Sequence, residues 1–127
     1  MKFIFMIVFF ILFLEAKEHK DNHKHYYNKD LTYLNLNETQ KESIKDIVKK
    51  YRKQIKQYRD EKDILEEEKR ASFLADKFDE NKIIDINKKI SFKNTQIEVE
   101  FLKQIHQVLD TSQRKRFAIH VEEWEVE

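Results

Sequence analysis

Residues 36–65 read LNETQKESIKDIVKKYRKQIKQYRDEKDIL, and this stretch decides the fold class. Its apolar residues recur at spacings of 4, 3, 4, 3 and 7, at Ile44, Val48, Tyr51, Ile55, Tyr58 and Leu65. Such a rhythm is typical of a long amphipathic helix that buries one seam. We therefore predict a helix that begins near Glu38 and continues almost to Phe78.

A second helical pattern follows a break near Asp79, a residue that can cap a helix starting at Glu80. Its apolar face extends to about residue 108 and consists of Ile83, Ile86, Ile90, Ile97, Phe101, Ile105 and Val108. A last helix is expected from Thr111, with an apolar face formed by Phe117, Val121 and Trp124. The sequence thus predicts an all-α fold, a long antiparallel helical hairpin with short flanking helices.

The composition supports this fold class by what it lacks. The 127 residues include no Gly, no Pro and no Cys. Tight β-turns and phosphate-binding loops depend on Gly or Pro, so a turn-rich β fold and nucleotide-binding loops are excluded. Without Cys there is no disulfide framework, thiolate metal site or cysteine nucleophile. The 25 basic and 24 acidic residues leave a charge of +1, so nucleic acid is not an expected partner.

The N-terminal region has the layout of an export signal. Lys2 precedes an unbroken apolar run over residues 3–14, and Ala16 follows it closely. This run is too short to span a membrane, which takes about 20 apolar residues. We predict a cleavable signal peptide over residues 1–16, a periplasmic location and no stable membrane insertion after cleavage.

The mature chain divides into two parts. Residues 17–30 (KEHKDNHKHYYNKD) are polar and lack apolar periodicity, which predicts a flexible arm. Residues 31–127 form the helical domain, in which residues 31–34 make a short helical turn that tucks Leu31 and Leu34 under the body. The acidic C-terminal end opposes the dipole of the last helix and is expected to fray.

The second helix carries a further apolar strip, formed by Phe92, Val99 and Leu102. A two-helix hairpin has a single seam to bury, which is little core for a chain of this length. The extra strip predicts a partner, most simply a second copy of the chain in a homodimer. The alternative is that the arm and the last helix fold back and cover it.

Two matching hexapeptides precede the first long helix and the last helix. They read LNETQK over residues 36–41 and LDTSQR over residues 109–114. Each combines an apolar residue, a good helix cap and a glutamine three residues after the cap, which are Leu36, Asn37 and Gln40 in one copy and Leu109, Asp110 and Gln113 in the other. This arrangement predicts two capping boxes, in which the cap and the glutamine satisfy each other's backbone N–H groups.

Two such boxes in an exported helical chain resemble the Leu-Thr-x-x-Gln motif of the Spy/CpxP family, related to heavy-metal sensors of the CnrX type. The likeness extends from about Leu34 to Trp124, although Asn37 and Asp110 stand where the family has Thr. It implies a bent four-helix protomer that dimerises into a cradle. The family includes ATP-independent chaperones, inhibitors of envelope sensor kinases and periplasmic metal sensors.

One candidate surface is a stripe of cations on the first long helix at spacings of 4, 3, 4 and 3, formed by Lys45, Lys49, Arg52, Lys56 and Arg59. Lys53, Lys88, Lys89 and Lys93 are candidate neighbours. With Tyr51 and Tyr58 as adaptable aromatic area, this stripe could bind an unfolded client by weak contacts that long-range attraction accelerates. The alternative is a solvated helix face with local pairs such as Lys56–Asp60.

The other candidate is a histidine cluster in the arm, formed by His19, His23 and His25. The spacing of four between His19 and His23 places both imidazoles on one side of a helical turn, where a third ligand could complete a Zn, Cu or Ni site. The family's metal sensors carry an N-terminal histidine pair at the same spacing. The alternative is a polar leader that binds metal weakly or not at all.

No catalytic grouping stands out, so we predict a binding protein that is not an enzyme and requires no cofactor. The leading hypothesis is a periplasmic ATP-independent chaperone that holds unfolded or misfolded envelope proteins on a basic, partly apolar helical surface. The alternative is a heavy-metal sensor that uses the arm histidines and signals to a membrane partner. A third hypothesis is a regulatory partner of an envelope sensor kinase.

Overall fold

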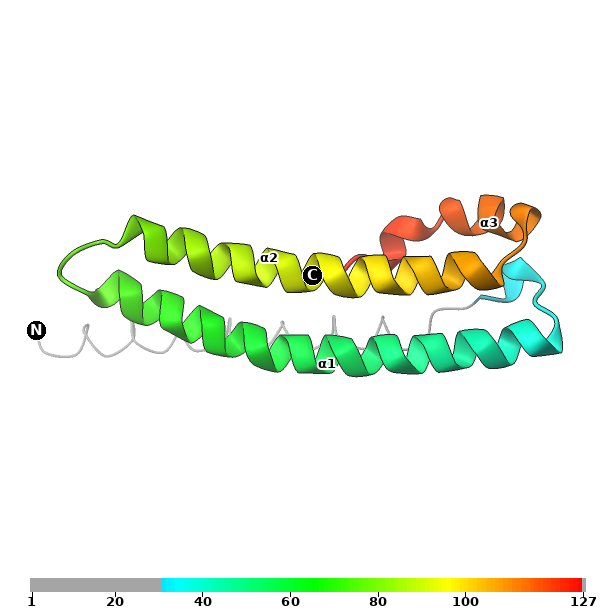
Figure 1. Cartoon of the computed structure of the whole chain (residues 1–127), viewed down its shortest axis with the longest axis horizontal. Helices are drawn as coiled ribbons and strands as arrows, with labels where there is room; N and C mark the ends of the chain where they lie inside the picture. The colour runs from blue at the N-terminus through cyan, green and yellow to red at the C-terminus, as the bar shows by residue number, and fades with distance from the viewer. Residues whose placement is uncertain (1–30, 127) are drawn as a thin grey trace, which may run out of the picture. The chain divides into compact units, whose positions relative to one another are not determined.

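A computed structural model of the chain describes residues 31–126, which pack as one compact unit. This part contains the 3₁₀ turn η4 (Thr32–Leu34), the helices α1 (Glu38–Leu74), α2 (Glu80–Val108) and α3 (Thr111–Ala118), and the 3₁₀ turn η5 (Val121–Trp124). Helices α1 and α2 lie side by side as a long antiparallel hairpin, and α3 folds back along α2 (Figure 1). The predicted all-α fold is confirmed, and no described helix is long and apolar enough to cross a membrane.

The helices begin where the capping residues predict. Asn37 precedes α1, Asp79 precedes α2 and Asp110 precedes α3, and each side chain accepts a hydrogen bond from the backbone N–H three residues later. The turn η4 ends at Asn35, the one described non-glycine residue with a positive φ, at 50°. Asn tolerates this left-handed conformation better than most residues, which matters in a chain that has no glycine.

The core lies in the half of the hairpin that α3 and η4 cover. Helix α1 contributes Ile44, Tyr51, Ile55 and Tyr58 to it, and α2 contributes Ile97, Phe101 and Ile105. The predicted turn at residues 31–34 is present, with Leu34 buried and Leu31 half-buried. Toward the loop between α1 and α2 the packing thins, so that residues 73–82 are all exposed.

The C-terminal end differs from the prediction in two ways. Helix α3 ends at Ala118, and Val121 and Trp124 belong to the separate turn η5 instead of continuing α3. The expected fraying is wrong for residues 121–126, because Trp124 and Val126 are buried in the core. The Trp124 ring stacks on Phe101 with centroids 4.8 Å apart, and the Tyr51 hydroxyl donates to the Trp124 carbonyl at 2.9 Å. Burial of this aromatic cluster outweighs the unfavourable helix dipole.

The signal peptide predicted at residues 1–16 and the arm predicted at residues 17–30 lie outside the described residues. Residues 31–126 contain three α-helices, where the family resemblance implied four helices in the protomer. The turn η5 occupies the stretch in which the last helix was expected to continue.

Candidate functional site

The two matching capping boxes meet in space. In each, the cap oxygen accepts from the glutamine N–H at 2.8 Å, and the glutamine Oε1 accepts from the cap N–H at 3.0–3.1 Å. The side chains of Gln40 and Gln113 also bond to each other, with Nε2–Oε1 distances of 2.8 and 3.0 Å in the two directions. The sequence predicts each box separately, and the structure joins them into one network.

This amide pair connects four segments. Gln40 Nε2 donates to the carbonyl of Val108 at the end of α2, at 3.0 Å. Gln113 Nε2 donates to the carbonyl of Leu34 in η4, at 3.2 Å. Since Gln113 is buried and Gln40 half-buried, water cannot easily replace these bonds. The motif glutamines therefore hold the base of the hairpin together, and their role is structural.

The cation stripe lies on α1 as predicted. Lys45, Lys49 and Lys56 are exposed and Arg59 is half-buried, and none of these four forms an ion pair within residues 31–126. The local pair that the alternative interpretation expected, between Lys56 and Asp60, is not among the ion pairs of this part of the chain. Most of the stripe's cations are thus not engaged in ion pairs with carboxylates of residues 31–126.

Two expectations about the stripe's surroundings are corrected. Tyr51 and Tyr58, expected among its contact residues, lie in the core, because they occupy the seam that faces α2. Two of the three expected cationic neighbours on α2 are engaged elsewhere: Lys89 pairs with Asp85 and Lys93 pairs with Glu61. The stripe is therefore cationic without an aromatic component of its own.

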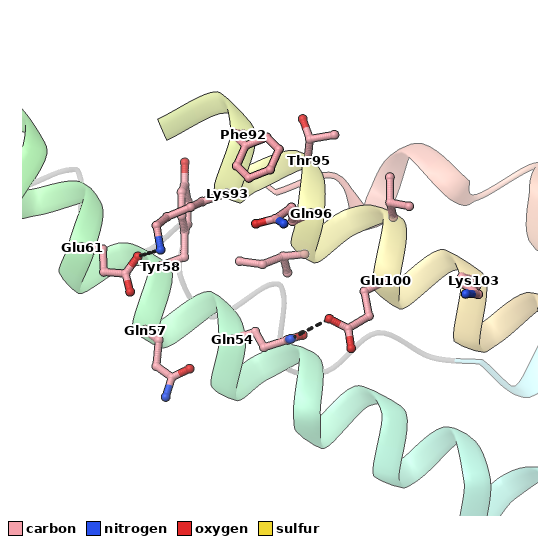
Figure 2. A pocket seen from close by; sticks show the side chains of 12 residues that line it. Gln54, Gln57, Tyr58, Glu61, Phe92, Lys93, Thr95, Gln96, Glu100 and Lys103 are labelled. Carbon is pink, nitrogen blue, oxygen red and sulfur yellow. Dashed lines mark hydrogen bonds and ion pairs between the residues drawn. The ribbon is translucent and has the colours of Figure 1, made fainter. Parts of the chain in front are cut away.

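Exposed apolar side chains occur instead in an open groove between α1 and α2 (Figure 2). The groove has a volume of about 660 Å³. Helix α1 lines it with Gln54, Gln57, Tyr58 and Glu61, and α2 with Phe92, Lys93, Thr95, Gln96, Ile97, Val99, Glu100 and Lys103. Phe92 is 64% exposed and Val99 is 56% exposed. By helical spacing the groove and the cation stripe lie on nearly opposite sides of α1.

Polar bonds across the helices fix the walls of the groove. Glu100 accepts from Lys50 at 2.6 Å and from Gln54 at 2.9 Å, and Lys93 pairs with Glu61. The hydrogen bonds from Lys50 and Gln54 lower the pKa of the Glu100 carboxyl, the lysine making the larger contribution. Burial raises the pKa of the Tyr58 hydroxyl, which belongs to a side chain that lines the groove. These groups favour Glu100 as a fixed anion and Tyr58 as a neutral phenol.

The comparison with family models agrees with the paired capping boxes. The model described as LTXXQ motif family protein matches residues 29–120, which include both hexapeptides and all three α-helices. The chain belongs to the LTXXQ motif family. This is the signature of Spy/CpxP-type proteins, which are typically periplasmic, helical and generally non-enzymatic. No curated protein and no solved structure gives a significant match.

In this LTXXQ family member the predicted site residues are distributed over three places. The motif residues form the amide network at the base, and the cation stripe lies along α1. The histidines His19, His23 and His25 lie outside the described residues. Within residues 31–126 no group of three His, Asp or Glu side chains could hold a metal ion.

The groove was not predicted as a site. The only signal for it in the sequence is the strip of Phe92, Val99 and Leu102, which predicts a partner, most simply a second copy of the chain, without indicating a groove. The structure shows that Leu102 is half-buried, whereas Phe92 and Val99 remain exposed and line the groove. The ion pairs that frame the groove join residues about 30–50 positions apart, so helical spacing alone gives no signal for them.

Proposed function

We propose that this LTXXQ family protein is a periplasmic, ATP-independent chaperone that binds unfolded or misfolded envelope proteins. The observation that supports this proposal is the open groove between α1 and α2, in which Phe92 and Val99 stay largely exposed. Exposed apolar side chains surrounded by polar groups are typical of surfaces that bind other proteins. The groove is open to solvent, so it suits many client segments better than one fitted small ligand.

The cation stripe, on the other side of α1, contributes to client binding in a second way. Four cations on one helix face that form no ion pair within residues 31–126 create a positive potential that attracts an acidic or partly acidic unfolded chain before any contact forms. Such attraction raises the association rate more than the final affinity, and salt screens it within about 10 Å at 0.1 M. The stripe therefore speeds capture, and the groove holds the apolar segments of the client.

The polar groups of the groove support binding in preference to catalysis. Glu61 and Glu100 are each engaged by a lysine, and the pKa of Glu100 is lowered. A general acid or base at neutral pH needs a carboxyl whose pKa is raised toward 7. The ion pairs instead keep the groove walls in place while clients bind and leave.

An aggregation assay tests the proposal. A chemically denatured protein is diluted into buffer with stoichiometric chaperone, and light scattering reports aggregation. We expect protection that is lost when Phe92→Ser and Val99→Ser are combined. The matched control combines Ile64→Ser and Ile119→Ser, which remove two apolar side chains of similar exposure outside the groove. Protection should survive in the control.

The stripe is tested separately by its effect on the capture rate. Combining Lys45→Glu, Lys49→Glu and Lys56→Glu should slow client association and reduce its dependence on salt. The control variant makes the same charge change at three exposed lysines elsewhere, Lys77, Lys82 and Lys115. If the two triple variants associate equally fast, the stripe has no specific role in capture.

Two results would contradict the proposal as a whole. One is the absence of protection by the wild-type protein at low salt. The other concerns the variant that combines Phe92→Ser with Val99→Ser. If this variant is a monomer where the wild type is a dimer, and if it protects as well as wild type, the groove is a self-association face. Light scattering of the purified proteins measures that state directly.

A further inference from the structure

A small pocket lies between α2 and α3, where α3 folds back along α2 (Figure 1). Its described lining residues do not overlap with those of the groove. Six of the eight are apolar. Ile105, Leu109 and Phe117 are buried and form the inner wall, while Leu102 and Val121 are half-buried. The pocket is thus a second concave surface with an apolar interior.

The pocket has room for one small apolar group. Its volume is about 210 Å³, and it is partly open to solvent. An apolar cavity of about 150 Å³ lined by Leu, Ile and Phe can hold one benzene ring. A drug-sized ligand occupies a pocket of roughly 300–1,000 Å³. The size of this pocket therefore suits a single ring, or a branched chain of similar volume, on a short linker.

A cation forms part of the wall. Arg114 lines the pocket, and its Nε donates to the His106 carbonyl at 3.0 Å, which holds the guanidinium in place. The terminal N–H groups of Arg114 form no hydrogen bond or ion pair within residues 31–126. The planar fork of a guanidinium matches the two oxygens of a carboxylate. Arg114 therefore favours an apolar ligand that carries a carboxylate.

The charges around the pocket also favour an anion. Of residues 31–126, none with a carboxylate lines the pocket. Residues 102–121 carry four lysine or arginine residues against the single carboxylate of Asp110. The Asp110 side chain accepts from the Gln113 N–H at 2.8 Å and is not paired with Arg114. The glutamates at positions 122, 123 and 125 lie outside the lining, and Glu123 pairs with His120.

We propose that this pocket binds a small apolar carboxylate, an aromatic or branched aliphatic acid with two or three carbons between the apolar group and the charge. The apolar group contacts Ile105, Leu109 and Phe117, and the carboxylate accepts hydrogen bonds from Arg114. Because the walls come from α2, α3 and η5, a bound acid joins these elements and stabilises the folded state. The site is independent of client binding at the groove.

The first test compares two ligands on the full-length protein by isothermal titration calorimetry. For 3-phenylpropionate we expect a Kd of about 0.1–1 mM, as is usual for so small a ligand. The alcohol 3-phenyl-1-propanol has the same ring and chain without the charge, and should bind roughly ten-fold more weakly. Trp124, the single tryptophan, stacks on Phe117 with centroids 6.4 Å apart, so its fluorescence gives a second readout. Absence of acid binding, or equal affinities for the acid and the alcohol, would overturn the proposal.

Two pairs of variants locate the ligand. Arg114→Gln should weaken binding of the acid roughly ten-fold and leave binding of the alcohol unchanged, whereas Lys115→Gln, at an exposed neighbour outside the lining, should change neither. Ala118→Phe fills the pocket from its exposed edge and should abolish binding of both ligands. Ala71→Phe makes the same change at an exposed alanine on α1 and should have no effect. Circular dichroism confirms that each variant keeps its helices. Binding of the acid that survives Arg114→Gln or Ala118→Phe would overturn the proposal.

Two further measurements separate this site from other ways of binding the same chemistry. N-acetylphenylalanine imitates the C-terminal residue of a polypeptide, and should bind several-fold more weakly than 3-phenylpropionate, because its amide would lie against apolar walls without a partner. Equal or tighter binding would assign the pocket to a chain terminus and overturn the free acid as its ligand. The variant that combines Phe92→Ser with Val99→Ser should bind the acid as wild type does. Loss of acid binding in that variant would assign the acid to the groove, whereas loss of client protection alone leaves this site intact.

Discussion

Replacing Gln113 with methionine should strongly destabilise the helical body, because this change keeps the side chain's length and removes its amide. The amide of Gln113, which is 4% exposed, takes part in four hydrogen bonds, two with Gln40 and one each with Leu34 O and Asp110 N. Each contributes about 1 kcal/mol net. We expect the free energy of unfolding to fall by about 3–4 kcal/mol.

This loss is large compared with the 5–15 kcal/mol that stabilises a typical domain. For a unit of this size it corresponds to a decrease in Tm of roughly 15–20 °C. The assay is urea denaturation followed by far-UV circular dichroism. The control is Gln107→Met, at an exposed position on α2, which should change stability by less than about 0.5 kcal/mol.

A double-mutant cycle with Gln40→Met tests the pairing itself. Each single variant already breaks both bonds between the two amides, so the double variant should lose less than the sum of the two single losses. A coupling energy near zero, or a loss below about 1 kcal/mol for Gln113→Met, would refute the inference that the two motifs form one network.

Three further outcomes are expected. Tyr51→Phe removes the hydrogen bond to the Trp124 carbonyl and should lower the free energy of unfolding by about 1 kcal/mol in denaturant titration; an unchanged midpoint would contradict this. The pKa of Glu100 is lower folded than unfolded, so its ion pair stabilises above pH ~4.3 and is lost as the pH falls through the folded-state value. Glu100→Gln should therefore flatten the acid side of the stability profile measured between neutral pH and about pH 3. Calorimetry with Zn, Cu and Ni should show no binding tighter than about 0.1 mM once His19→Ala and His23→Ala are combined, and tight binding by that variant would place a metal site elsewhere.

Much of the fold is determined by local sequence. Asn37, Asp79 and Asp110 each satisfy N–H groups only three residues away, so a short window contains all the information about where each helix starts. The apolar seam of each long helix is equally visible as a spacing. The absence of Gly and Pro removes competing turn structures. The capping hydrogen bonds and the apolar spacings act within one or two helical turns, which is why the hairpin could be predicted.

The places where prediction failed depend on which segments meet. Tyr51 and Tyr58 occur at the spacing of the buried apolar seam, but a tyrosine side chain can also lie on a binding surface. Contact with Phe101 and Trp124 places Tyr51 in the core. The C-terminal end has the charges of a fraying helix, yet burial of Trp124 against residues from three other segments holds it. Long-range packing outweighs local propensity at both sites.

The sequence by itself determined an all-helical hairpin, its three helix starts and the family to which it belongs. Only the tertiary structure decided that Gln40 and Gln113 bond to each other, because their two boxes are 73 residues apart in the chain. The tertiary structure likewise placed the groove on the side of α1 away from the cation stripe and left the rings of Phe73 and Phe78 exposed. Local hydrogen bonds fix where helices begin, whereas the position of one helix against another decides which of their faces remain free to bind.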